Sequence, residues 1–440
     1  MNNAFRLPAA IAATLLFFSG LKAQTDTTKG FVATPNPLDR FTAFYMHPLS
    51  SHYEGSMFEA DYGLEFSSNC AVNALAYDFY FKKPLNAADI KTTADKLSAL
   101  NIGGRETNAG FQFVISPKKM YNHLFTVKYA FRRHQSAEFT NDFGNFFFRG
   151  NKQGAGKEQI FDDLQYLTTR YDALQLGWTR FFTIKGRRAN IAVSAGLARG
   201  FEYRRYDIGR SRMFTESNGE YIDLSLELEA KQSYFQPYRP FYLEPSGWGA
   251  ICDVKFNMAI NEKTGIGVDI SDIGFIRWKE GSSTYSRRDT TIRYEGVFVS
   301  SPDSLSSPSY VERLGDSIVT RFNIPFSVNA FSSALPARFA LTYYLKFNDK
   351  HFLNIRLRAM AIASYRPQLN IESVNFIGKK FYSTTGISIG GFGPFDIYQS
   401  CGWQINKRYS TALGLFGIEG MLLPTKTAGF GGRLAVAARL

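Results

Sequence analysis

Five histidines are the first candidates for chemistry, because imidazole titrates near neutral pH and binds metal ions. They are His47, His52, His123, His134 and His351. None has a Ser or Asp at the spacing of a known nucleophile motif, and the sequence has no metal-ligand cluster, Walker loop or nucleophile elbow. We therefore expect no enzyme, no cofactor and no metal site, and interpret the histidines as solvated or interfacial side chains.

Charged residues that alternate with apolar ones form a second candidate group. Its members are Asp223, Glu227, Glu229, Asp253, Lys255, Asp269, Arg356 and Arg358. If their segments are strands of a closed wall, these side chains face its lumen. Two outcomes then stay open: the charges line an aqueous or ligand path, or they pair with one another and fill a small interior.

The segments that must position these charges have a period of two. In residues 222–231 every even position is apolar, from Ile222 to Ala230, and every odd position is polar, from Asp223 to Lys231. A helix would mix these two sets, whereas a strand separates them onto two faces. The same alternation recurs in residues 125–132, 190–197, 250–260, 266–271, 338–347 and 353–361.

The length and number of these segments favour a membrane barrel over a soluble β-sandwich. A sandwich strand has about five or six residues, whereas many of these segments run to about ten, as tilted transmembrane strands do. We therefore predict an all-β fold, a transmembrane antiparallel β-barrel of about 14 strands (14–16).

The connections alternate between short and long, as barrel topology requires. Short turns are expected at residues 185–188, 261–263, 348–350 and 406–408, and long loops near 134–171, 204–220 and 280–335. The last of these loops has room for another hairpin. Residues 86–100 depart from the strand pattern, because Asn86 can cap a short amphipathic helix. Strands alternate in direction, so the positions of the later short turns place this helix outside the cell or in the lumen. Its size, however, suits a periplasmic linker.

The N-terminus indicates export. Arg6 precedes an apolar run from Leu7 to Phe18, and the small residue Ala23 follows, which is typical of a secretory signal peptide. This run is too short to span roughly 30 Å of hydrocarbon as a helix. We expect residues 1–23 to be a cleaved signal, 24–52 a segment before the barrel and 53–440 an outer-membrane barrel.

The C-terminus ends inside a segment that alternates from Phe430 to Leu440. This ending resembles the sorting strand of outer-membrane proteins, which implies the barrel-assembly machinery as a partner. Outer-membrane lipid and lipopolysaccharide are the other expected partners.

The composition fits this assignment. The 440 residues include 41 Phe, 24 Tyr and 37 Gly, a combination that favours β-structure with close backbone contacts. The formal charge of +13 is spread along strands and turns rather than gathered in a stripe, so no nucleic-acid partner is expected. Three cysteines, Cys70, Cys252 and Cys401, do not suggest a disulfide framework.

Two segments resemble a known group of proteins. They are SDIGFIRWK, from Ser271 to Lys279, and LPARFALTYYLKF, from Leu335 to Phe347. Both look like motifs of a group of Bacteroidota outer-membrane barrels similar in outline to FadL-type transporters and to PorP/SprF-like proteins linked with gliding and type IX secretion. The first contains the motif residues Asp272, Gly274, Phe275, Arg277 and Trp278. We interpret Gly274 as a bulge and Trp278 as part of an interfacial aromatic girdle.

The resemblance and the polar row together suggest two functions. The first is a FadL-like conduit for a small hydrophobic or amphipathic molecule. The alternative is a non-conducting scaffold barrel of a surface, gliding or type IX secretion complex, for which the long loops are the sequence cue. The fold does not decide between them.

Overall fold

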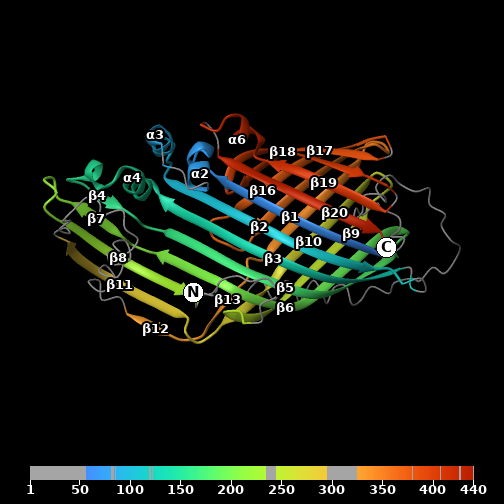
Figure 1. The fold of residues 1–440 in the computed structure, drawn as a ribbon, viewed down its shortest axis with the longest axis horizontal. Helices are drawn as coiled ribbons and strands as arrows, with labels where there is room; N and C mark the ends of the chain where they lie inside the picture. Colours follow the sequence, from blue (N-terminus) through green and yellow to red (C-terminus); the bar gives the residue numbers. More distant parts are fainter. Residues whose placement is uncertain are drawn as a thin grey trace.

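The computed structural model describes residues 56–439 apart from 81–83, 85, 118, 119, 121, 234–243, 295–324, 379, 407, 426 and 427. Its main feature is a closed antiparallel barrel (Figure 1). The wall strands, in ring order, are β1 (Met57–Ser68), β2 (Leu100–Ile115), β3 (His123–Thr140), β5 (Leu164–Ile184), β6 (Arg187–Ile208), β9 (Gly247–Ala259), β10 (Thr264–Trp278), β14 (Arg338–Lys346), β15 (His351–Met360), β16 (Arg366–Ile377), β17 (Phe381–Gly391), β18 (Gly393–Gln404), β19 (Tyr409–Phe416) and β20 (Gly429–Arg439).

The ring closes where the last strand pairs with the first. Met57 of β1 lies opposite Arg439 of β20, and the pairing continues to Ser67 and Gly429. The predicted barrel of about 14 strands is thus confirmed. The alternation works as expected, because Leu174, Leu176 and Leu197 are more than half exposed on the outward face while the polar residues between them are turned inward. The predicted signal peptide and N-terminal segment lie outside the described residues, as does Leu440.

The long connections lie at one end of the barrel, which also holds the short β15–β16 and β17–β18 connections, and short turns join the wall strands at the opposite end (Figure 1). All four predicted short turns occur between neighbouring wall strands. Three of them share a local motif, in which an Asn side-chain oxygen accepts two backbone N–H groups further along the turn. At Asn261 the donors are Lys263 and Thr264, and Asn348 and Asn406 repeat this geometry.

Replacing Asn261 with Ala should therefore lower the free energy of unfolding by about 1 kcal/mol, because two hydrogen bonds that close the β9–β10 turn are lost. Urea unfolding in detergent micelles would measure this. Glu262→Ala is the matched control, since Glu262 is an exposed neighbour in the same turn. Equal effects of the two substitutions would show that the Asn motif contributes nothing specific.

The long-connection end carries a sheet that continues beyond the barrel. It consists of β4 (Glu158–Ile160), β7 (Arg212–Thr215), β8 (Ile222–Gln232), β11 (Ser283–Tyr294) and β12 (Phe326–Val328). A further short strand, β13 (Phe331–Ala334), pairs with the end of β10. The predicted strand at 222–231 exists, but β8 pairs with β11, β7 and the outer end of β6 and is not a wall strand. The long loops begin later than predicted, because β3 continues to Thr140 and β6 to Ile208.

The helices are short and lie at the long-connection end (Figure 1). They are α2 (Asn73–Tyr80), α3 (Ala87–Asp95), α4 (Asn141–Arg149), the 3-10 turn η2 (Asn151–Gly154) and α6 (Ile418–Leu422). The helix predicted for 86–100 is α3, capped by the Asn86 side chain, which accepts the backbone N–H of Ala88. It ends at Asp95, earlier than predicted. Within the described residues, no helix has the length and apolar character needed to cross a membrane.

Candidate functional site

The barrel interior contains a polar cavity of about 400 Å³. Side chains of β1–β3, β10 and β14–β20 line it, among them five arginines and six carboxylates. The arginines are Arg132, Arg338, Arg356, Arg358 and Arg433, and the carboxylates are Asp61, Glu65, Glu106, Asp269, Glu372 and Asp396. Hydroxyl, amide, aromatic and small apolar side chains make up the remaining lining. The cavity can therefore hydrogen-bond to a solute of either charge.

Glu106 is the centre of the ion pairs that border this cavity. Its carboxylate lies 3.0 Å from an Nη atom of Arg358 and 3.5 Å from one of Arg338. Arg338 also reaches Asp272, at 3.4 Å, and Arg132 lies 3.7 Å from the same carboxylate. The side chains of Glu106 and Asp272 are only 5% and 4% exposed, so both charges depend on these arginines for their stabilisation.

These ion pairs cross the interior rather than following one wall. Glu106 lies on β2 and Arg338 on β14, and five wall strands separate β2 from β14 on one side and seven on the other. The two strands are thus almost opposite each other in the ring. A contact of 3.5 Å between their side chains means that the interior is bridged at this level.

Asp272 reaches this network because of a β-bulge. The register between β9 and β10 shifts between Ile270 and Ile273, and Asp272 has a left-handed backbone with φ of 59°. Its backbone N–H donates to Asp253, at 2.8 Å, and Lys128 contacts the other oxygen of Asp253, also at 2.8 Å. The bulge predicted at Gly274 lies two residues earlier. Gly274 is instead a close-approach position, where a Cβ would lie 2.1 Å from the carbonyl oxygen of Ala250.

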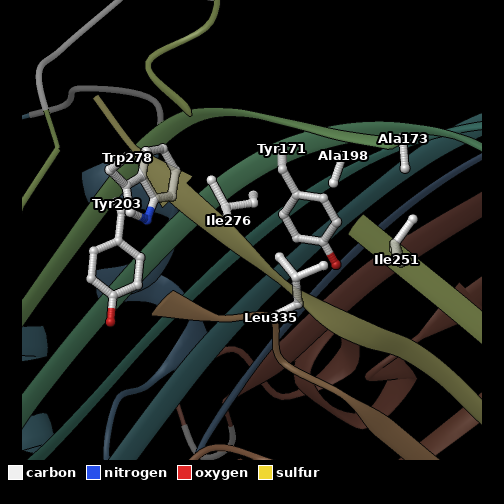
Figure 2. Close-up of a cluster of buried hydrophobic side chains, with 8 residues drawn as sticks. All are labelled: Tyr171, Ala173, Ala198, Tyr203, Ile251, Ile276, Trp278 and Leu335. Atoms are coloured by element: carbon white, nitrogen blue, oxygen red, sulfur yellow. The ribbon is translucent and has the colours of Figure 1, made fainter. Parts of the chain in front are cut away.

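An apolar cluster fills the interior beside the long-connection end of β5, β6, β9 and β10. It consists of Tyr171, Ala173, Ala198, Tyr203, Ile251, Ile276, Trp278 and Leu335 (Figure 2). Trp278 is fully buried, and its Nε1 donates to Ser333 Oγ at 2.9 Å. The prediction that Trp278 belongs to an interfacial girdle is therefore wrong. The bulge causes the difference, because the extra residue turns Ile276 and Trp278 inward and leaves Phe275 and Arg277 outward and exposed.

Comparison with known proteins supplies a family but no function. The profile of a family of unknown function, DUF5723, matches residues 61–386, which is most of the chain. The chain belongs to the DUF5723 family. No curated protein matches its sequence.

Several solved barrels are similar to this DUF5723 protein in fold. The Pseudomonas putida toluene transporter TodX is 7% identical, with a TM-score of 0.42, and covers 91% of this chain and 92% of its own. The Ralstonia pickettii toluene transporter TbuX is 9% identical, with a TM-score of 0.42 and coverage of 94% and 96%. A Pseudomonas aeruginosa FadL homologue is also 9% identical, with a TM-score of 0.42 and coverage of 92% and 94%.

Five of the eight predicted lumen residues lie on wall strands. Asp269, Arg356 and Arg358 line the cavity, Asp253 is buried under Lys128, and Lys255 pairs with Asp269 at 3.0 Å. The other three require a correction. Asp223, Glu227 and Glu229 lie on β8, beyond the wall, and do not line this cavity. There Asp223 pairs with Arg293 of β11, at 2.8 Å.

The sequence did not single out Glu106 or Arg338, although both are central to the bridge. Glu106 is hard to recognise because Gly103, Gly104 and Arg105 interrupt the alternation before it. Arg338 opens an alternating segment, and this was its only signal.

His134 was predicted to be solvated or interfacial, but it is 2% exposed, 3.8 Å from Glu106 and packed against Phe392. His123 does lie on the outward surface, where it accepts a hydrogen bond from Trp178 at 3.0 Å. Within the described residues, no group of three or more His, Cys, Asp or Glu side chains is arranged to hold a metal ion.

Proposed function

We propose that this DUF5723 protein is an outer-membrane conduit that admits a small amphipathic molecule. The membrane placement is supported by the apolar outward face of the ring, by the short turns at one end and by the signal-like N-terminus. By the usual orientation of such barrels, the short turns face the periplasm and the long connections face outward.

The charged lining of the cavity is the observation from which we infer an amphipathic substrate. A purely hydrophobic molecule placed there would strip water from the more exposed charges of this lining, such as Asp61 and Arg433, and offer no hydrogen bonds in return. An amphipathic molecule can direct its polar group toward these side chains and its apolar part toward the rings and small apolar side chains of the same lining, which include Tyr382, Ala412 and Ala435. A small zwitterion or acid with an alkyl side chain meets both conditions.

Flux through proteoliposomes tests this function. Labelled leucine, as a small amphipathic probe, should enter vesicles that contain the protein faster than empty vesicles, and faster than glucose does. Equal entry of leucine into both kinds of vesicle would contradict the proposal.

Filling the cavity should abolish this flux. Ala412 of β19 lines the cavity, so Ala412→Trp places an indole in the path. Leu415 of the same strand is 43% exposed on the outward face and does not line the cavity, and Leu415→Trp is the matched control that should leave leucine uptake unchanged. Equal uptake by the two variants would show that solute does not pass through this cavity.

A scaffold role is the second candidate, and the sheet beyond the barrel favours it. The β8–β11 ladder stands outside the wall and provides surface that a conduit does not need. Affinity purification from detergent extracts distinguishes the candidates, because a scaffold should retain a stoichiometric partner protein. If no partner is retained and leucine flux is present, the scaffold role fails.

A further inference from the structure

The outward face of β2, β3, β5 and β6 is apolar toward the short-turn end. Two rows of directly opposite residues show this: Phe111, Tyr129, Leu174 and Leu197, and next to them Phe113, Val127, Leu176 and Ala195. Leu174, Leu176 and Leu197 are exposed by 55%, 68% and 63%. These rows are suited to contact with hydrocarbon.

Toward the long-connection end the same face becomes strongly basic. One row consists of Thr107, Arg133, Arg170 and Glu202, and the next of Arg105, Gln135, Thr168 and Arg204. We call the four arginines of these rows the arginine belt. Their sequence neighbours Glu106, Arg132 and Arg205 line interior cavities, so the alternation of a strand places the belt on the outside.

The belt has more positive charge than its own carboxylate can neutralise. Glu202 lies 3.8 Å from Arg170 and 3.6 Å from Arg204, and it is the one acidic residue in the two rows against four arginines. The row between the belt and the apolar rows is balanced, because Arg199 pairs with Asp172 at 2.6 Å. Leu64 and Phe66 of β1, which lie opposite Thr107 and Arg105, supply no charge.

We propose that the arginine belt binds the phosphate groups of lipid A, the phosphorylated lipid part of lipopolysaccharide in the outer leaflet. This rests on the outer-membrane placement proposed above. The belt lies one row beyond the apolar face, at the level where lipid headgroups join their acyl chains. Arginine presents a planar fork that matches two phosphate oxygens, and neighbouring strands about 4.8 Å apart put several such forks within reach of one headgroup.

Lipid binding in nanodiscs tests the belt. The full-length protein is placed in phosphatidylcholine nanodiscs doped with lipid A, and retained lipid A is counted by native mass spectrometry. Replacing Arg133 and Arg170 together with Gln should lower the affinity for lipid A by roughly tenfold, because two charge-assisted contacts are removed. Lipid A without its phosphates should bind to the unaltered protein as weakly as lipid A binds to this variant.

The matched control removes two arginines from the opposite end of the same hairpin. Arg180 of β5 and Arg187 of β6 lie near the short turn, and the double variant Arg180→Gln with Arg187→Gln should retain lipid A like the unaltered protein. If this variant loses as much lipid A as the belt variant, net charge rather than the belt is responsible, and the proposal is overturned. It is also overturned if dephosphorylated lipid A binds as well as lipid A.

Heat-modifiable migration in SDS gels reports whether each variant is folded. If the Gln variant does not fold, Arg133→Lys with Arg170→Lys keeps the charge and removes the planar forks. Weaker retention of lipid A by the Lys variant supports the proposal, and unchanged retention contradicts it. The retention of lipid A is measured without solute flux, and the outer-membrane placement is measured separately by cell fractionation. Failure of the arginine belt to bind lipid A can therefore be distinguished from failure of the barrel to conduct a solute.

Discussion

Replacing Glu106 with Gln is expected to lower the free energy of unfolding by about 3 kcal/mol or more, because a buried charge network loses its shared anion. Glu106 is 5% exposed and contacts Arg358 at 3.0 Å and Arg338 at 3.5 Å. Arg338 keeps Asp272 as a second partner, at 3.4 Å. Arg358 then loses its direct ion pair and keeps only the weaker interactions with Glu65 and the Tyr365 ring, and this loss is the main cost. Urea unfolding in micelles would measure the difference.

The double variant separates the value of the pair from the cost of breaking it. Removing both charges, as Glu106→Gln with Arg358→Gln, should be less destabilising than Glu106→Gln alone, because the buried cation is removed together with its main partner. Asp349→Asn is the surface control. Asp349 pairs with Lys346 in an exposed turn, and its loss should change stability by less than about 1 kcal/mol. If the double variant is less stable than the single one, the bridge is not held by this ion pair.

Replacing Trp278 with Ala should cost about 4 kcal/mol of unfolding free energy, since a fully buried indole leaves a cavity behind. The ring lies 5.6 Å from Tyr203 and 6.4 Å from Phe331, between centroids, and its Nε1 donates to Ser333. The backbone of Gly200 approaches the indole so closely that a Cβ there would lie 2.5 Å from it, so little space is available for relaxation.

Two further variants identify the cause of this loss. Trp278→Phe keeps most of the apolar contact and should lose less stability than Trp278→Ala, although Ser333 loses its donor. Trp403 is 53% exposed on the outward face of β18, and Trp403→Ala should have a much smaller effect in the same unfolding experiment. Equal losses at Trp278 and Trp403 would contradict the interior cluster.

The ion pairs across the interior show why the sequence could predict that lumen charges pair with one another but could not predict which charges pair. Glu106 and Arg358 are 252 residues apart in the chain. Which charges meet across a lumen depends on the register of every strand between them, and one bulge shifts that register. From the sequence the bulge was placed at Gly274 rather than at Asp272. A bulge at either position reverses the face of the residues after it, and the girdle assignment of Trp278 took no account of this change.

The strand β8 shows a second reason. Its alternation is the cleanest in the chain, yet Asp223, Glu227 and Glu229 stand beyond the wall. Alternation reports that the two faces of a strand have different surroundings. It does not report whether the strand belongs to the closed ring or to a sheet that continues past its rim.

The sequence by itself determined the local structure: the alternating strands, the Asn turns, the capped helix after Asn86 and a ring of about 14 strands. These features depend on residues within a few positions of one another, through strand periodicity, turn hydrogen bonds and helix capping. Only the tertiary structure decided which strands close the ring, that Glu106 is bridged to Arg338 and Arg358, and that the arginines at the outer rim form one belt. Those contacts join strands distant in sequence, so they depend on register and closure, which no local pattern contains.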